Sequence, residues 1–577
     1  MSILRANPSL RDTRSYLKDF GPRPIKVIPA KPQALPLSST ESKPIAADVR
    51  PPDIVQEQEK ALTETQSTVI ASILNPVYRR TSLVKLQGPF TERQLDSIAR
   101  GMIYLEKLGL VSVIVVENDD LVRGEVGERS AVVEETMRVV SALEKQGAKA
   151  RPVLGAVVRL GPKPGDEETD SAVPVPEAHT FPSDLVHIRS ALKAGEIPVL
   201  SPLALDSFYR SVRVDANDVV AALVRGMVEA ADVDRQASSS PEERLAVSDE
   251  DIDLTPLRLM VINKEGGVPS YARSGLPHLL VNLASEYDYI RNTFDPRWKS
   301  THPSALSNLK LARTCLEYMP TSSSAVMVSH RSPSSLIANL ITNKPAVSSS
   351  LPHALLQGNR KLDFHTPTLL RRGLDVRVIR STADIDKVKM KTLLEQSFRR
   401  ELDEEAFWTR LEKSLDFVIV SGDYAGAAIV TTEQCPSGSP KAYAPITYLD
   451  KFAVLPSHQG DGTVDFLWVA LHDESYGLGL PFSANPNGGK EGKGEGRDLV
   501  WRSRADNPVN KWYFERSTGH LRLGDWVLFW CDAEKRLKTE EGRRGSAGLS
   551  YLEDWEHGRL GTWSDVVTKI PSSWKKK

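Results

Sequence analysis

The 577-residue sequence has few cysteines, no long apolar run and no excess of charge of either sign. Its three cysteines, Cys315, Cys435 and Cys531, lie far apart and form no CxxC pair. This spacing fits a reducing compartment and offers neither a disulfide framework nor a zinc ligand set, so we expect no metal. Lys plus Arg number 74 against 75 for Asp plus Glu, and this balance argues against nucleic acid as a partner.

The longest apolar runs, such as Val111–Val116, fall far short of the about 20 residues that a membrane helix needs. We therefore expect a soluble protein with no membrane partner. Residues 1–31 carry seven Lys or Arg against two Asp, a bias typical of mitochondrial transit peptides. A basic amphipathic helix of the mature protein, over residues 3–20, is the equally open alternative. Residues 21–53, rich in Pro, Ser and Ala, predict a flexible linker.

The length predicts two or three domains, and the pattern after residue 82 predicts the α/β class. Strands and helices alternate there, which favours a parallel sheet. The expected strands are Leu83–Leu86, Val111–Val116, Pro152–Val158, Ile197–Leu200 and Leu257–Ile262. The expected helices are Glu92–Leu108, Ser130–Gln146 and Asp215–Ala230, and the acidic stretch Asp232–Asp253 is expected to be a surface loop.

A second α/β unit with a mixed sheet is expected after about residue 372. Its elements are a strand, two helices and an antiparallel hairpin, in that order. They are predicted at Val376–Ile379, Ala383–Phe398, Glu401–Leu415, Phe417–Val420 and Ala427–Val430. The stretch Asn485–Arg497 is rich in Gly, Lys and Glu and predicts a disordered insertion.

Residues 448–464 read as a strand, a glycine-rich turn and a helix. Val464, Leu467, Trp468 and Leu471 would form one apolar helix face toward the sheet. A glycine turn at a helix N-terminus presents backbone N–H groups and the positive end of the helix dipole, which suits a pyrophosphate such as that of coenzyme A. On spacing alone such a turn is more often an ordinary loop, and the flanking strand and helix favour the binding interpretation.

This turn resembles the acetyl-CoA signature of the GNAT superfamily, which Gln459 and Gly462 match and from which Val464 departs. The resemblance implies that the preceding strand, Phe452 through Leu455, pairs with the pantetheine arm and supplies an N–H to the thioester oxygen. The implied cofactor-binding residues are Phe452, Val454, Gln459, Gly460, Gly462 and Thr463, with acetyl-CoA as the co-substrate.

A second informative stretch runs from Leu499 to Phe514. Arg502 and Arg504 alternate, so on a strand both side chains face one side and could fork onto carboxylates. Without further context such a pair is usually a surface feature. Asn507 followed by Pro resembles a helix cap, and Tyr513 would ordinarily be a packing aromatic.

Residues 375–532, with Tyr448-Leu449-Asp450-Lys451-Phe452 and the Trp-Arg-Ser-Arg, Asn-Pro and Trp-Tyr-Phe series, resemble the catalytic domain of N-acetylglutamate synthases. That resemblance implies acetyl transfer from acetyl-CoA to the amino group of L-glutamate within a ternary complex. It implies that Lys451, Arg502, Arg504 and Asn507 hold the carboxylates of glutamate and that Tyr513 donates a proton to the CoA thiolate. Asp450 and His458 are candidates for the general base by proximity alone.

Three earlier stretches, Ile197–Leu203, Val214–Asp218 and Val261–Val268, resemble the second half of an amino-acid kinase fold. The opening of that fold is reduced here to Lys85-Leu86-Gln87-Gly88, and Asn263 stands at an expected acidic position, which argues against phosphoryl transfer. The synthase resemblance implies that this domain binds arginine as a feedback inhibitor and builds a homo-oligomer. It also implies a mitochondrial matrix location and association with N-acetylglutamate kinase.

The expected domains are an N-terminal helix and linker with a transit region (1–75), an amino-acid-kinase-like regulatory domain (76–355) and a GNAT domain (356–577). Two alternatives stay open for the function. One is a GNAT enzyme for another anionic amino acid, which the two arginines and the lysine would also fit. The other is a catalytically weak, arginine-sensing regulatory subunit, which the departure at Val464 leaves open.

Overall fold

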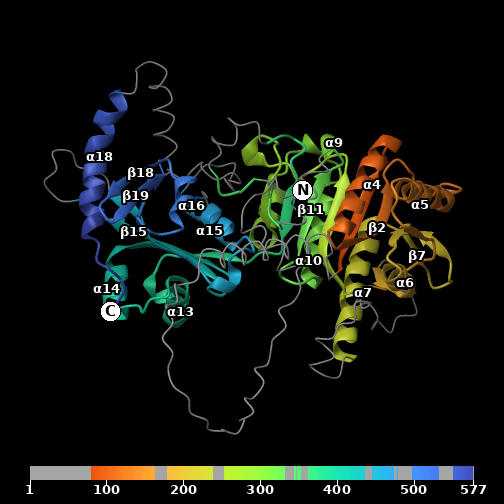
Figure 1. The fold of residues 1–577 in the computed structure, drawn as a ribbon, viewed down its shortest axis with the longest axis horizontal. Helices are drawn as coiled ribbons and strands as arrows, with labels where there is room; N and C mark the ends of the chain where they lie inside the picture. Colours follow the sequence, from red (N-terminus) through yellow and green to blue (C-terminus); the bar gives the residue numbers. More distant parts are fainter. Residues whose placement is uncertain are drawn as a thin grey trace, which may run out of the picture.

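The computed structural model forms two α/β units side by side, the second drawn in teal and blue in Figure 1. It describes residues 79–162, 179–237, 253–331, 343–345, 347–351, 362–435, 445–472, 477–478, 497–531 and 550–575. The expected helix at 3–20, the linker at 21–53 and the insertion at 485–497, apart from Arg497, lie outside these residues. No helix within the described ranges is both long and apolar enough to cross a membrane.

The first unit is built on an eight-stranded sheet of order β10-β12-β11-β9-β1-β2-β6-β3. Its strand pairs are parallel except for β12, which runs antiparallel to β11. The strands are β1 (Arg80–Gly88), β2 (Leu110–Asn118), β3 (Ala150–Val153), β6 (Ile197–Leu200), β9 (Asp253–Asn263), β10 (Leu280–Asn282), β11 (Ser324–Ser329) and β12 (Thr368–Arg371).

Helices cover both faces of this sheet, because the strand residues alternate between two apolar clusters. One face carries α4 (Glu92–Lys107) and α5 (Glu128–Lys145). The other carries α6 (Val186–Lys193), α7 (Ala216–Ala237), α8 (Leu283–Thr293) and α10 (Ala305–Tyr318). The short η1 (Tyr271–Arg273) and α9 (Trp298–Thr301) complete the helical elements described here.

Two sequence expectations for this unit are wrong in detail. The single strand expected over 152–158 is two strands, because β3 ends at Val153 and β4 (Val158–Gly161) joins a separate sheet. That small sheet has the order β5-β4-β7-β8, with β5 (His179–Pro182), β7 (Leu203–Leu205) and β8 (Ser211–Arg213). The loop expected from Asp232 begins later, because residues 232–237 continue α7. Residues 238–252 lie outside the described part.

The second unit contains a seven-stranded sheet of order β13-β14-β15-β16-β17-β19-β18, in which only β16 and β17 are parallel. The mixed sheet and the element order confirm the α/β, GNAT-like expectation. The strands are β13 (Val376–Ile379), β14 (Leu415–Ser421), β15 (Gly426–Glu433), β16 (Ile446–Val454), β17 (Leu499–Arg504), β18 (Gly519–Leu523) and β19 (Trp526–Cys531).

Each face of this sheet has its own helices. On one face lie α13 (Lys387–Phe398), α14 (Glu404–Ser414) and α18 (Ser550–Lys569), and on the other lie α15 (Thr463–His472) and α16 (Asn510–Phe514). Two short turns, η2 (Thr382–Asp384) and η3 (Pro456–His458), precede α13 and α15. The apolar face expected for α15 is confirmed, since Leu467, Trp468 and Leu471 are buried and Val464 packs against the same cluster.

The last strand of the first sheet, β12, lies beyond the domain boundary expected at 355/356. It pairs with β10 and β11, so it belongs to the first unit. We propose a division between Arg371 and Val376.

The two units contact each other near the N-terminus of α15. Phe466 is 6% exposed and belongs to the apolar cluster of the first unit. Asp465 accepts hydrogen bonds from Ser348 Oγ (3.0 Å) and from Ser350 Oγ. Arg516 donates to Ser350 Oγ at 2.7 Å and to Ser348 Oγ at 3.0 Å. The start of α15 and Arg516, two residues after the end of α16, are therefore anchored to one loop of the first unit.

Candidate active site

The central strands of the second sheet separate at a β-bulge. Ile429 of β15 is opposite Lys451, whereas the adjacent Val430 is opposite Leu449, so Asp450 is the extra residue on β16. On its other side β16 pairs with β17 only through Thr447 and Tyr448. Within the described residues, the edge of β16 beyond Tyr448 that faces β17 has no strand partner. An extended ligand could pair with this edge as an added strand.

The glycine turn between β16 and α15 lies next to this opening. Gly460 and Gly462 have φ of +100° and +96°, values that favour glycine. Asp461 Oδ1 accepts hydrogen bonds from the N–H (3.0 Å) and the hydroxyl (2.7 Å) of Thr463, the first residue of α15. The Asp461 carboxylate therefore caps the N-terminus of α15. Gln459 Nε2 donates to Val454 O at 3.2 Å and ties the turn to the strand. Residues 459–463 are thus held in one compact loop at the N-terminus of α15.

Tyr513 lies on the same face as this turn, within a cluster of aromatic rings. Its ring centroid is 5.4 Å from that of Trp501, 5.5 Å from Phe529 and 5.6 Å from Trp512. Phe452 of β16 stacks on Trp512 with the centroids 6.0 Å apart. Burial raises the pKa of Tyr513 above its usual value, so the phenol is protonated near neutral pH.

Lys451 lies on the opposite face of the sheet, in a group of paired charges. Its ammonium donates to Asp450 Oδ2 at 2.7 Å, and Arg410 of α14 donates to Asp450 Oδ1 at 2.8 Å. Arg410 also pairs with Glu433. Burial by itself would raise the pKa of Asp450, but Lys451 and Arg410 outweigh it and the pKa is lowered. Asp450 is therefore an ionised, fixed anion and a weak proton acceptor.

Arg502 and Arg504 project from β17 toward α18, on the Lys451 face. Arg502 donates to the carbonyls of Val567 (2.6 Å) and Ile570 (2.7 Å) at the end of α18. Both guanidiniums lie over the Trp526 ring, at 4.6 Å and 5.4 Å from its centroid. Among the described residues, no carboxylate forms an ion pair with either arginine.

The backbone N–H of Asn507 donates to Arg504 O at 3.0 Å, but the Asn507 side chain lies on the face opposite the two guanidiniums. Its Nδ2 donates to Ser503 Oγ at 2.8 Å, on the Tyr513 face of β17, and its Oδ1 accepts from Val509 N at 3.1 Å. The helix expected to begin at Pro508 begins at Asn510, with Val509 at the N-cap. Asn507 therefore caps the turn that leads into α16.

His458, the other base candidate, lies in the glycine turn rather than on the Lys451 face. Its Nδ1 is 3.0 Å from Asp461 Oδ2, so it supports the residue that caps α15. Sequence reasoning missed Arg410 and Ser573, which contact the Asp450–Lys451 pair. Neither residue stands in a recognisable motif, and the chain returns Ser573 to the site only after α18.

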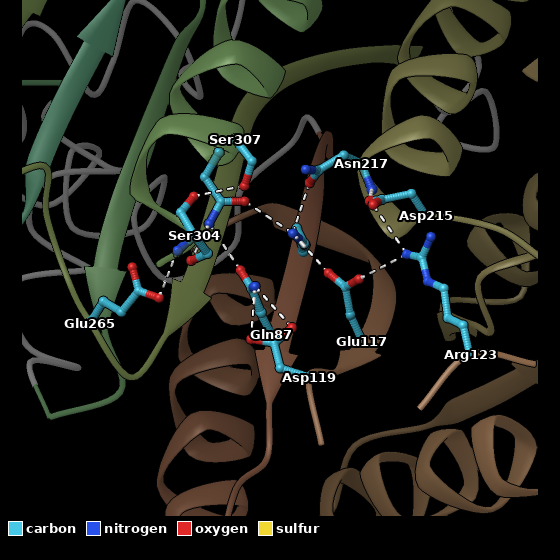
Figure 2. A network of polar contacts seen from close by, with 11 residues as sticks. Gln87, Glu117, Asp119, Arg123, Asp215, Asn217, Glu265, Ser304 and Ser307 are labelled. Carbon is cyan, nitrogen blue, oxygen red and sulfur yellow. Dashed lines mark hydrogen bonds and ion pairs between the residues drawn. The ribbon is translucent and has the colours of Figure 1, made fainter. Parts of the chain in front are cut away.

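The first unit buries a separate polar network, shown in Figure 2. Lys85 is 1% exposed, and its ammonium contacts Glu117 Oε2 at 2.8 Å, Asn217 Oδ1 at 2.7 Å and Asn308 Oδ1 at 3.0 Å. These three acceptors occupy the three N–H groups of the lysine. Lys85 thus serves as an internal connector of the sheet.

The network continues through side chains that bond to one another (Figure 2). Asn308 Nδ2 donates to Gln87 Oε1 at 2.9 Å and to Ser304 Oγ at 3.0 Å. Gln87 Nε2 donates to Asp119 at 2.9 Å, and Ser304 N donates to Glu265 at 3.1 Å. Burial raises the pKa of both Asp119 and Glu265. In the described parts of both units, no group of His, Cys, Asp or Glu side chains has the arrangement of a metal site.

A mixed sheet that opens at a bulge beside a glycine turn defines the second unit as a GNAT-type N-acetyltransferase. The N-acetyltransferase domain of N-acetylglutamate synthase matches residues 376–478 and 493–541. The mitochondrial amino-acid acetyltransferase of Coprinopsis cinerea is 68% identical over 583 residues, covering 100% of this chain and 91% of that protein. Its counterpart in Laccaria bicolor is 66% identical over 578 residues, covering 100% and 98%. The chain therefore belongs to the family of mitochondrial amino-acid acetyltransferases, and it is an enzyme of that family.

Among solved structures, the N-acetylglutamate synthase from Neisseria gonorrhoeae complexed with coenzyme A and N-acetyl-glutamate is similar with a TM-score of 0.41 and 14% identity, covering 82% of this chain and 99% of that chain. The family membership confirms the expectation drawn from the Trp-Arg-Ser-Arg and Gln-Gly-Asp-Gly stretches.

Proposed function

We propose that this enzyme transfers the acetyl group of acetyl-CoA to the amino group of L-glutamate, giving N-acetyl-L-glutamate and CoA in the first step of arginine biosynthesis. The observation that carries the proposal is the opening between β16 and β17. It has a glycine turn on one face and two arginines without a carboxylate partner among the described residues on the other. The two faces suit an anionic cofactor and a dicarboxylic acceptor.

Acetyl-CoA would enter from the α15 face. The pyrophosphate would lie against Gly460, Gly462 and Thr463 at the positive end of the α15 dipole. The pantetheine arm would pair with the open edge of β16 from Phe452 to Val454, where a backbone N–H can polarise the thioester carbonyl. Gln459 would hold the turn against the end of that strand through its bond to Val454 O.

Glutamate would bind from the opposite face. Arg504, which is exposed and has no ion-pair partner among the described residues, would bind one carboxylate in a forked geometry. Lys451 and Arg502 would supply the remaining positive charge for the other. Glutamine, which carries one carboxylate, would leave part of this positive charge uncompensated, and this favours a dicarboxylic amino acid. We propose that Asn507 acts at longer range, by shaping the turn before α16.

In the reaction, the neutral amine attacks the thioester carbon, the C–N bond forms and the C–S bond breaks. The proton that the nitrogen loses passes to water and returns through water to Tyr513, which has protonated the thiolate. The departing thiolate lies on the side of Tyr513, whose raised pKa keeps its hydroxyl protonated and able to donate. Asp450 is poorly suited to accept the amine proton, because its neighbours lower its pKa. We therefore assign it the task of orienting Lys451.

For the first unit we propose a regulatory role, in which arginine binds as an inhibitor. The pairing of Lys85 with Glu117 supports this role over phosphoryl transfer, because the ammonium is 1% exposed and all three of its contacts are 3.0 Å or shorter, which makes each costly to exchange for a phosphate. We further propose a homo-oligomer in the mitochondrial matrix, delivered by a transit region within residues 1–75, with N-acetylglutamate kinase as a protein partner.

The decisive experiment measures release of CoA thiol from acetyl-CoA by the purified full-length chain. Glutamate, aspartate, glutamine and no acceptor are compared, each with and without arginine. Release specific to glutamate and suppressed by arginine is expected. Preference for another anionic amino acid would replace the substrate assignment. Absence of release with every acceptor, together with arginine binding, would instead favour an arginine-sensing subunit.

A further inference from the structure

The C-terminal segment, residues 570–575, lies directly against the acceptor side of the site. It follows α18 and falls outside the stretches that match the N-acetyltransferase domain. Ser573 is 5% exposed, and its hydroxyl accepts a hydrogen bond from Lys451 Nζ at 3.1 Å. The ring of Trp574 lies 6.0 Å from the same ammonium. Two consecutive residues therefore contact a lysine far from them in sequence.

The segment is fixed in place by backbone bonds to the stretch before α14. Asp403 N donates to Ser573 O at 3.0 Å, and Lys575 N donates to Glu401 O at 3.1 Å. Leu402 and Trp574 form the antiparallel bridge between these bonds. The Trp574 ring also packs on Phe398, with the centroids 5.0 Å apart. A short ladder of this kind fixes the position of the Ser573 hydroxyl.

The same part of the chain also holds Arg502. Its guanidinium donates to Val567 O and Ile570 O, at the last turn of α18, where helix carbonyls lack intrahelical partners. Lys451 and Arg502 lie on strands that stop pairing after Tyr448, so the ladder between β16 and β17 does not set the distance between these cations. The stretch from Val567 to Ser573 contacts both and bridges the gap.

We propose that the C-terminal segment positions the two acceptor-binding cations, with Ser573 and Trp574 as positioning residues for Lys451. Of the three oxygen acceptors around the ammonium, Asp450 Oδ2 at 2.7 Å and Ser573 Oγ at 3.1 Å orient it. The third, Asp450 O at 3.3 Å, is the longest and is the contact that an acceptor carboxylate replaces. The inference rests on the proposed binding of an amino acid by Lys451.

The test compares full-length variants in steady-state kinetics with both substrates varied. Ser573→Ala removes the acceptor of the Lys451 bond, and we expect the KM for glutamate to rise about tenfold, as for loss of a hydrogen bond to a charged group. The KM for acetyl-CoA is expected to stay within a factor of two. Ser573→Thr keeps the hydroxyl and is expected to restore most of the affinity. Trp574→Phe is expected to raise the glutamate KM less than Ser573→Ala does.

Lys575→Ala is the matched control. It breaks an exposed ion pair with Glu401 on the same segment without touching Lys451, and it is expected to leave both KM values unchanged. An unchanged glutamate KM in Ser573→Ala would overturn the inference. So would equal losses in Ser573→Ala and Lys575→Ala, because these would point to general loosening of the segment.

The acceptor is the amino acid that the wild-type chain uses best. If that acceptor is not glutamate, the proposed substrate is wrong, whereas a selective rise of its KM in Ser573→Ala still supports the positioning role. If the wild-type chain acetylates no amino acid, both proposals fall.

Discussion

The two glycines of the turn before α15 allow a matched test of the proposed acetyl-CoA site. Both have positive φ, near +100°, but their surroundings differ. A Cβ on Gly460 would meet nothing within 4 Å, whereas a Cβ on Gly462 would lie 3.2 Å from the Phe466 ring and 3.5 Å from the Arg371 side chain. Alanine at either position strains the backbone, and only at Gly462 does it also press on packed neighbours.

The expected costs follow from this difference. A positive φ costs an alanine about 1–2 kcal/mol, which is about 5- to 30-fold in binding if the strain is relieved by deforming the turn. Overpacking against Phe466 adds about 1 kcal/mol, or roughly another fivefold. We therefore expect Gly460→Ala to raise the KM for acetyl-CoA by about tenfold and Gly462→Ala by about fiftyfold.

The assay measures both KM values by thiol release, with urea unfolding of each variant as a check on overall stability. The KM for glutamate is expected to change little, because the acceptor cations lie on the other face of the sheet. Equal effects of the two substitutions would refute the packing argument. A rise in the glutamate KM with an unchanged acetyl-CoA KM would refute the placement of the cofactor at this turn.

Four further outcomes are expected. Tyr513→Phe should lower kcat about 100-fold, with little change in either KM, if the hydroxyl serves the leaving thiolate. Arg504→Gln should raise the KM for glutamate at least tenfold by removing a charge-assisted hydrogen bond, with acetyl-CoA affinity as the internal control. Burial lowers the pKa of His472 from 6.5 to about 4, so the stability that neutral His472 contributes is complete above pH 6.5 and lost as the pH falls toward 4. His472→Asn should therefore flatten the pH dependence of urea unfolding by about 3 kcal/mol over that interval. Lys85→Met should destabilise the first unit by about 3 kcal/mol in urea, because it leaves Glu117 with only the more distant Arg123, 4.0 Å away, as a cation. Lys85→Met combined with Glu117→Gln should recover part of the loss.

The fold of the second unit could be predicted because its local patterns agree with its tertiary structure. The run Val376–Ile379 is β13, and the hairpin expected from Phe417 to Val430 is β14 and β15. In the first unit, the strand expected over 152–158 was wrong because one apolar run serves two sheets, a division that periodicity cannot reveal.

Within the candidate site, the sequence predicts local geometry only where a motif is contiguous. The glycine turn and the Trp-Arg-Ser-Arg strand lie within short stretches, so their local geometry follows from spacing. The bulge at Asp450 depends on its register with β15, and the contacts of Lys451 with Arg410 and Ser573 depend on long-range packing. Such relations between distant segments leave no periodic signal in one sequence.

Phe466 of the second unit lies in the apolar core of the first unit, and this affects whether either unit could be replaced without the other. The helix that begins at the glycine turn belongs to the second unit and is contacted by residues of the first, Ser348, Ser350 and Arg371. The two halves are therefore not freely interchangeable modules. A chimera built from a foreign first unit must therefore provide a compatible packing site for this one phenylalanine.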